Sequence, residues 1–182
     1  CASTRGAAAA GDGLDGEAMG TTWSVRFVPT AATPPTAVLQ AGIQAQLDTV
    51  DAQMSTWTPD SDLGRFNRAP AGTWQALPPE LFTVLSAALA LARDTGGAYD
   101  PTVGPLVDLW GFGPGPKALR NPDADTLAAT RARVGWQRIR LDPSGHRAWQ
   151  PGGVRVDLSS IAPGFAVDQI ARYLDRVGVH HY

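Results

Sequence analysis

Apolar and polar residues alternate over residues 20–28. Trp23, Val25 and Phe27 occupy every second position, with polar residues between them. This is the period of a β-strand that turns one face toward a core and the other toward water. The pattern therefore predicts a strand early in the chain.

Helical spacing follows this strand. After a pair of prolines, apolar residues recur every three or four positions at Leu39, Ile43, Leu47, Val50 and Met54. They predict one buried stripe of a long helix. A second helix is expected between Pro79 and Gly96 and a third between Pro122 and Gly135, because proline favours a first helical turn and glycine an end.

The last helix is expected over residues 165–177, an amphipathic stretch that ends at Gly178, a residue typical of helix ends. The pattern of residues 179–182 then indicates the start of a strand. A strand of only a few residues rarely ends a chain, so we expect further sequence beyond Tyr182.

Short strands are predicted between these helices. Residues 111–116 contain three glycines and two prolines, which indicates a loop. Strands are expected at residues 136–141, 146–150 and 154–158, because Pro/Gly-rich turns separate them. Helices and hairpins in separate blocks indicate the α+β class rather than repeated βαβ units.

Composition narrows the possible partners. Of 182 residues, 43% are hydrophobic and 18% are charged, against about a quarter charged in average globular chains, so a mostly folded protein is expected. The formal charge of −2, without a long basic run, argues against a nucleic-acid partner. The most apolar stretch, residues 81–92, is shorter than the roughly 20 residues that a membrane-spanning helix needs.

The chain starts at Cys1, its only cysteine, followed by small residues with few large apolar groups. We expect residues 1–18 to be a flexible tether and residues 19–182 to be the folded part. A cysteine at the mature N-terminus of such a tether is typical of a bacterial lipoprotein, whose thiol carries lipid. The alternative is an arbitrary chain boundary with an ordinary free thiol.

Several segments could carry chemistry. Residues 154–164 run from an expected strand into a helix N-terminus, where backbone N–H groups and the helix dipole favour an anion such as phosphate, although most turns of this kind are simply turns. Trp57 lies in a polar turn in which Asp60 or Ser61 can cap the next helix. We expect Trp57 to be partly exposed, either as a stacking platform for a ring or as a cover for a core edge.

Other candidates have simpler explanations. Asp100 precedes a proline, which favours a tight turn, and its carboxylate is a candidate site residue or only a helix cap. Met19 needs no function to explain its place before the first strand. The three histidines show no zinc-ligand spacing.

Four blocks, at residues 19–24, 54–67, 98–113 and 157–168, occur in one order along the chain. The most diagnostic runs Asp-Pro-Thr-Val-Gly-Pro-Leu from Asp100 and leads into Leu-Trp-Gly-Phe-Gly. Together they closely resemble the ApbE family, the FAD:protein FMN transferases, whose older label is thiamine biosynthesis lipoprotein. The resemblance implies an ApbE-like α+β fold of mixed helices and antiparallel strands, of which the C-terminal half is absent from this chain.

The resemblance also implies an activity. Such an enzyme is Mg²⁺-dependent, cleaves the pyrophosphate of FAD and transfers the FMN half to a threonine hydroxyl of a target flavoprotein, releasing AMP. Related outcomes are an FAD pyrophosphatase that gives FMN and AMP, and a non-catalytic flavin-binding lipoprotein. Members are often lipid-anchored on the periplasmic side of the bacterial inner membrane, which agrees with the interpretation of Cys1.

The residues implied to contact FAD are Met19, Trp57, Ala98, Tyr99, Asp100, Ser159 and Phe165. The backbone carbonyl of Ala162 is implied as a Mg²⁺ ligand, and no catalytic residue is assigned within this chain.

The sequence departs from the family at several positions. Pro163 replaces a residue that is commonly lysine, and Trp23, Trp57 and Phe165 replace tyrosine, which keeps a ring but loses a hydroxyl. The Asp and Thr side chains that complete the family's magnesium site, and a candidate histidine base, belong to the family's second half. We therefore expect the 182-residue chain alone to be inactive.

Overall fold

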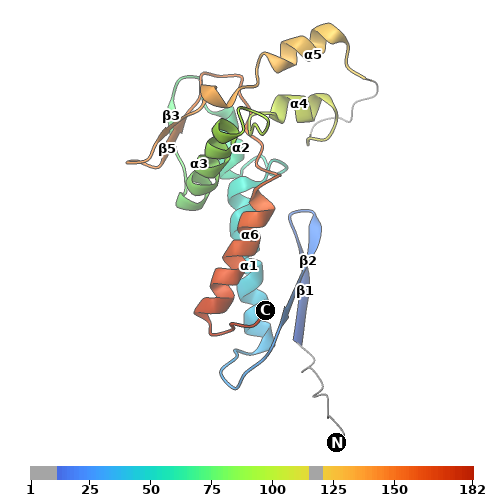
Figure 1. Ribbon diagram of the computed structural model, residues 1–182, viewed down its shortest axis with the longest axis vertical. Helices are drawn as coiled ribbons and strands as arrows, with labels where there is room; N and C mark the ends of the chain where they lie inside the picture. The colour runs from blue at the N-terminus through green and yellow to red at the C-terminus, as the bar shows by residue number, and fades with distance from the viewer. Residues whose placement is uncertain (1–11, 115–120) are drawn as a thin grey trace, which may run out of the picture. The chain divides into compact units, whose positions relative to one another are not determined.

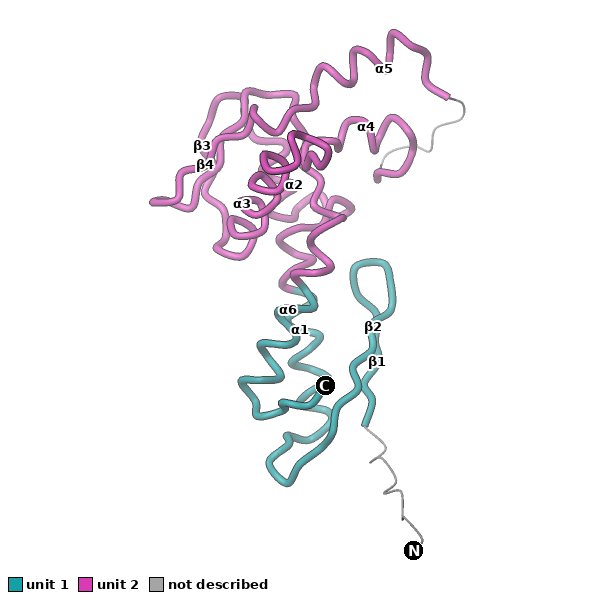
Figure 2. The backbone as a smooth tube through the Cα atoms, in the orientation of Figure 1, with its two compact units in different colours: residues 1–48, 166–182 teal, residues 49–165 magenta. Residues whose placement is uncertain are grey.

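The computed structural model describes residues 12–114 and 121–182 (Figure 1). It has the expected α+β architecture, with helices and two antiparallel sheets. The chain divides into two compact units, residues 1–48 with 166–182 and residues 49–165 (Figure 2). Each unit is built around its own buried side chains.

The first unit opens with a β-hairpin. Strand β1, Asp12–Ala18, pairs along its whole length with β2, Thr21–Phe27, the strand that alternation predicts. The two-residue turn at Met19 and Gly20 has φ angles of 54° and 75°, the positive values that a tight hairpin connection with the strands' own twist requires. Residues 12–18 are thus a strand and not part of a tether, and the rest of the expected tether, including Cys1, lies outside the described residues.

Two helices complete the core of this unit. Helix α1, Thr36–Met54, begins here, and its predicted apolar stripe is buried. Helix α6, Ala162–Arg176, ends here at Gly178 as expected, because a φ of 84° lets the Val179 N–H donate to the Leu174 carbonyl at 2.9 Å.

Hydrogen bonds join α1 to both of its neighbours in this unit. The side-chain amides of Gln40 and Gln44 donate to backbone carbonyls of β1, at 2.9 and 3.3 Å. The Tyr173 hydroxyl of α6 donates to the Val38 carbonyl at 3.2 Å. A Cβ at Gly42 would lie 2.0 Å from the Tyr173 ring, so α1 and α6 approach this closely only because residue 42 is glycine.

The second unit combines a small sheet with helices. Strands β3, Trp74–Ala76, β4, Arg140–Asp142, and β5, Arg147–Trp149, pair antiparallel in the order β3-β5-β4. The strand expected at residues 146–150 is therefore confirmed. The helices are α2, Asp62–Arg68, α3, Pro79–Asp94, α4, Gly104–Leu109, and α5, Ala124–Arg131.

The helix boundaries follow the local signals. Helix α3 starts at Pro79 and stops before Gly96, as expected. Its cap residue has no side-chain hydrogen bond, and the buried Gln53 instead accepts the Leu81 N–H at 3.1 Å. Helix α5 is capped by Asp123, which accepts the Thr126 N–H at 2.7 Å.

One predicted strand is wrong over its first half, and another is wrong throughout. Residues 136–138 form a 3₁₀ turn, η1 (Trp136–Arg138), and only residues 140–142 continue as β4. Residues 154–158 form no regular strand and share only an isolated parallel bridge, between Val103 and Arg155. In both places side chains from distant segments take the backbone groups that a ladder would use.

Three further expectations concern the loop at residues 111–116, the C-terminal tail and membrane-spanning helices. Residues 111–114 form turns, as the loop prediction requires, and residues 115 and 116 lie outside the described residues. The tail 179–182 shows no strand, although the Val28 N–H donates to the His181 carbonyl at 2.9 Å. Across residues 12–114 and 121–182, no helix has the length and apolar character needed to cross a bilayer.

Candidate functional site

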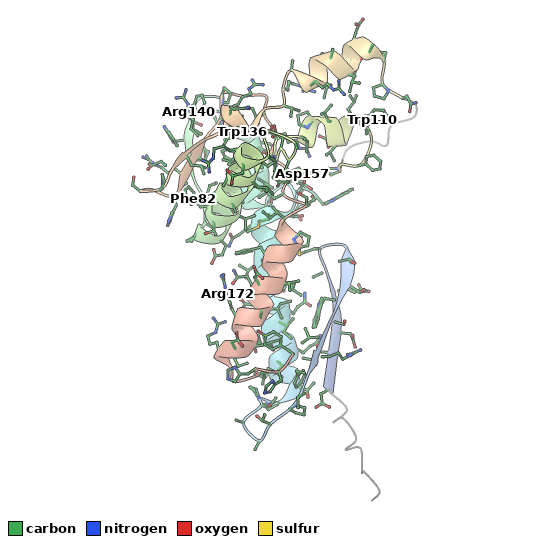
Figure 3. The ribbon with its side chains drawn as sticks, viewed as in Figure 1. Phe82, Trp110, Trp136, Arg140, Asp157 and Arg172 are labelled. Atoms are coloured by element: carbon green, nitrogen blue, oxygen red, sulfur yellow. The ribbon has the colours of Figure 1, made fainter. Side chains whose placement is uncertain are left out.

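Two of the four sequence blocks lie side by side in the second unit. The Asp157 N–H donates to the Pro101 carbonyl at 2.7 Å, and the bridge between Val103 and Arg155 continues the contact. Asp157 lies on the stretch that leads into α6 (Figure 3). Segments more than 50 residues apart in sequence therefore meet through their backbones.

Tyr99 and Ser160 connect the same segments through side chains. The Ser160 hydroxyl lies 3.5 Å from the Tyr99 hydroxyl, at the limit of a hydrogen bond. Ser160 is exposed and Tyr99 is half-buried. Two hydroxyl groups thus meet at the surface where the blocks join, a polar edge that suits phosphate or ribose oxygens.

The Asp100 carboxylate accepts hydrogen bonds from several donors within the protein. Its carboxylate accepts from the Thr102 N–H and hydroxyl, at 2.8 and 2.6 Å, and from the Trp136 N–H at 3.0 Å. Thr102 in turn accepts the Gly135 N–H at 2.7 Å. The helix-cap alternative is wrong, because α4 starts at Gly104 with Val103 as its cap. Asp100 instead ties the turn at residues 98–102 to η1.

Ser159 lies in the turn before α6. Its N–H donates to the Asp157 carboxylate at 2.8 Å, and the N–H groups of Ile161 and Ala162 both donate to the Leu158 carbonyl, at 3.0 and 2.8 Å. These three amides are used inside the protein. The exposed hydroxyls of Ser159 and Ser160 and the dipole of α6 remain available to an anion.

Trp57 presents its ring to solvent. It lies in the loop between α1 and α2 with 66% of its surface exposed, which confirms the expected exposure. Ser61, not Asp60, caps α2 by accepting the Gly64 N–H at 2.9 Å, and it also donates to the Ser55 carbonyl at 2.6 Å. The loop is thus held at its base while the indole face remains available for stacking.

Three further candidates flank these turns. Ala98 is exposed beside Tyr99, Phe165 is half-buried in the first turn of α6, and Ala162 is buried. Met19 lies in the hairpin turn of the other unit, where it is half-buried. The second unit therefore contains every candidate except Met19.

A Mg²⁺ site is not complete in this part of the protein. Ala162 offers only a neutral backbone carbonyl, and at the first position of α6 this oxygen also serves the intrahelical ladder. Among residues 12–114 and 121–182, no three His, Cys, Asp or Glu side chains are grouped to hold a metal ion. The described residues therefore do not by themselves fit Mg²⁺, which prefers several anionic or water oxygens.

Three residues that hold the site together were not identified from sequence: Asn67, Thr102 and Trp136. The Asp-x-Thr spacing at residues 100–102 is a signal for the first contact, since such side chains commonly bond to the backbone two residues on. Trp136 lies in η1 (Figure 3). Its N–H bonds to Asp100, and the Asn67 side chain bonds to Val156. Both contacts join segments that are far apart in sequence, so no local pattern predicted them.

Comparison with known proteins agrees with this arrangement. The ApbE family model matches residues 19–182, and the chain belongs to this family. It is 39% identical over 172 residues to the FAD:protein FMN transferase of Klebsiella pneumoniae strain 342, an alignment that covers 93% of this chain and 49% of that protein. The chain spans about half the length of the curated relatives it matches.

Solved structures show the same fold. The apo form of the Pseudomonas stutzeri flavinyl transferase ApbE matches with a TM-score of 0.87 and 37% identity, over 93% of this chain and 56% of that one. The flavin transferase ApbE from Vibrio cholerae matches with a TM-score of 0.89 and 36% identity, over 93% and 55%. The expected family and fold class are therefore confirmed.

Proposed function

We propose that the full-length protein is an FAD:protein FMN transferase. The observation that carries this proposal is the contact between the Tyr99–Asp100 turn and the Ser159 turn, made by Asp157 and Pro101 at 2.7 Å. These turns belong to two of the four blocks that resemble the family, and their meeting forms one polar edge from residues distant in sequence.

The proposed reaction transfers the FMN group from the bridging pyrophosphate oxygen of FAD to a hydroxyl oxygen of the acceptor protein. A threonine hydroxyl of a target flavoprotein forms a bond to the phosphorus of the FMN half of FAD and loses its proton. The bond from that phosphorus to the bridging pyrophosphate oxygen breaks, and AMP leaves with that oxygen. Such transfers depend mainly on in-line positioning and on neutralisation of phosphate charge.

Each candidate residue has a proposed part in binding FAD. The exposed ring of Trp57 stacks on one of the two ring systems, and Phe165 supplies a second aromatic face. The hydroxyls of Tyr99 and Ser159 bond polar oxygens of the dinucleotide, while Asp100 keeps the turn that includes Ala98 in place. Met19 supplies a polarizable sulfur contact.

Mg²⁺ dependence is part of the proposal. The ion would be held partly by the Ala162 carbonyl, with carboxylate ligands from the half of the family's length that this chain does not cover. When bound, it would supply positive charge to the pyrophosphate. Removal of divalent ions by a chelator is expected to abolish AMP release, and re-addition of Mg²⁺ to restore it.

The test is a transfer assay with the full-length protein, FAD, Mg²⁺ and a flavoprotein domain with an acceptor threonine. We expect a covalently fluorescent acceptor whose mass increases by one FMN, together with AMP. Release of AMP without acceptor labelling would instead identify an FAD pyrophosphatase. Retention of FAD without any AMP would identify a flavin-binding lipoprotein.

Trp57→Ala tests the stacking role. We expect the KM for FAD to rise about two- to thirteenfold, the equivalent of the roughly 0.5–1.5 kcal/mol of a ring pair. Trp74→Ala is the matched control, because Trp74 is also exposed (43%) but lies on β3. A KM that is equal in the two variants would remove Trp57 from the site.

We also propose that Cys1 is lipidated and that the protein is anchored on the periplasmic side of the bacterial inner membrane. Cys1 lies outside the described residues, so support comes from the sequence and from the family resemblance alone. The native protein is expected to fractionate with membranes and the Cys1→Ala variant with the periplasm. An unmodified N-terminal mass in protein from native membranes would contradict the anchor.

A further inference from the structure

Asn67, at the end of α2, bonds to the backbone of a residue 89 positions later. Its Oδ1 accepts the Val156 N–H at 2.8 Å, and its Nδ2 donates to the Val156 carbonyl at 2.8 Å. Val156 is fully buried. One side chain therefore satisfies both backbone groups of a residue that lies three positions before Ser159.

The geometry explains why an amide is needed here. Successive peptide groups of an extended chain point to opposite edges, and the residues on either side of Val156 use the edge that faces residues 101–103. The Val156 groups point the other way, where Asn67 takes the place of a neighbouring strand. A carboxamide offers a donor and an acceptor in one plane, whereas a carboxylate offers acceptors alone.

Loss of this amide would leave two buried backbone groups without partners. Buried N–H and C=O groups are almost always paired, and the segment would move to find new partners or water. Asp157 and Leu158 follow directly, and their oxygens fix the amides of Ser159, Ile161 and Ala162. Movement at Val156 would thus pass to the whole turn before α6.

We propose that Asn67 is a positioning residue for FAD binding. It holds the Ser159 turn and the start of α6 at the place where they face the Tyr99–Asp100 turn, and it acts through Val156 without touching the dinucleotide. The inference rests on the proposed function and deepens it, since it names how the dinucleotide site is held together.

The experiment compares Asn67→Ala with Asn121→Ala in the full-length protein. Asn121 is the only other asparagine of the chain, and it is exposed. The readouts are kcat and KM for FAD, measured by AMP release, and amide hydrogen exchange of residues 154–160. Asn67→Ala should raise the KM for FAD at least tenfold and speed exchange in this segment at least tenfold, while Asn121→Ala should stay within twofold of the wild type in both.

The KM value separates positioning from an irreversible loss of folded enzyme, which lowers kcat and leaves KM unchanged. Reversible unfolding of the whole protein raises the apparent KM by the inverse of the folded fraction, and it is recognised because it speeds exchange in every element and not only at residues 154–160. A lower kcat with an unchanged KM would therefore overturn the proposal, as would unchanged exchange at residues 154–160. Asn67→Asp keeps the acceptor for the Val156 N–H, and it is judged by the same two readouts if the alanine variant does not fold.

Failure of the proposed function is recognised in the wild type. If the wild type releases no AMP, the reaction is wrong, and the Kd for FAD replaces KM as the readout. A Kd at least tenfold weaker in Asn67→Ala would still support the positioning role. An equal Kd, or a wild type that binds no FAD, would overturn it.

Discussion

Thr102 is a fully buried polar residue at the centre of the hydrogen bonds around Asp100. Its hydroxyl donates to Asp100 and accepts from Gly135. Thr102→Val keeps the shape but leaves the Gly135 N–H without its acceptor, so we expect a loss of about 1–3 kcal/mol in the free energy of unfolding. Urea unfolding measures this change.

The control for this substitution is Thr22→Val. Thr22 is exposed on β2, where valine suits a strand, so its effect should remain within about 0.5 kcal/mol. Equal losses in the two variants would show that the hydroxyl of Thr102 does not hold the turn.

Asp142 makes the stability of the second unit depend on pH in the acid range. The hydrogen bond from the Ser144 hydroxyl, and then the bonds from Arg147, lower the pKa of this carboxyl to about 2. A lowered pKa stabilises the fold above the unfolded value of about 3.9, and this contribution disappears as the pH falls toward 2. Asp142→Asn should therefore lower the melting temperature at pH 5, with less than about half of that difference remaining at pH 2.5.

The control variant is Asp12→Asn, which changes an exposed carboxylate at the start of β1. Melting temperatures of the three proteins are compared at both pH values. A deficit of Asp142→Asn that is as large at pH 2.5 as at pH 5 would contradict the assigned cause.

Helix α6 offers a test at the scale of an element. Gly178, at its C-terminal end, has a φ of 84°, whereas Gly164 lies in its first turn, where an added Cβ meets no atom within 4 Å. Gly178→Ala should cost about 1 kcal/mol, and Gly164→Ala should add about 0.5–1 kcal/mol. Thermal unfolding should show shifts of opposite sign, and shifts of the same sign would contradict this account of the two helix ends.

Elements also differ in how they are held in place. Helices α1 and α6 meet where Gly42 leaves room for the Tyr173 ring, while the small sheet of the second unit rests on three-residue strands. Arg140 lies over the Trp149 ring at 4.7 Å and Arg147 over the Trp74 ring at 5.7 Å. Such short strands depend on side-chain contacts more than on their few ladder bonds.

At the scale of the whole molecule, residues 1–182 alone should not transfer FMN. No three His, Cys, Asp or Glu side chains among the described residues are grouped to hold a metal ion, and loss of a positioned cation removes several kcal/mol of transition-state stabilisation, a rate factor of about a thousand or more. FAD affinity and turnover are measured for this chain and for the full-length protein. Transfer at comparable rates would show that the site is complete without the other half.

The two measurements separate two causes of inactivity. Binding of FAD without turnover would indicate missing metal ligands. Loss of both would indicate that the fold depends on contacts from the rest of the protein.

Much of the architecture was determined by local physics and could be predicted. The stripe of α1, the boundaries of α3, the cap at Asp123 and the glycine end of α6 each depend on residues within a few positions of one another. Periodicity, capping and backbone conformation act over that range. The exposure of Trp57 followed from the same local signals.

Tertiary structure decided what these signals could not. Residues 12–18 are mostly small or acidic, with Leu14 as the one large apolar residue, and they become a strand through pairing with β2. Asp100 takes the Trp136 N–H from 36 residues away, and the first half of an expected strand is η1 instead. Asn67 takes both backbone groups of Val156, which prevents a ladder at residues 154–158. In each case a hydrogen-bonding group has several possible partners in the sequence, and only the folded chain selects one of them.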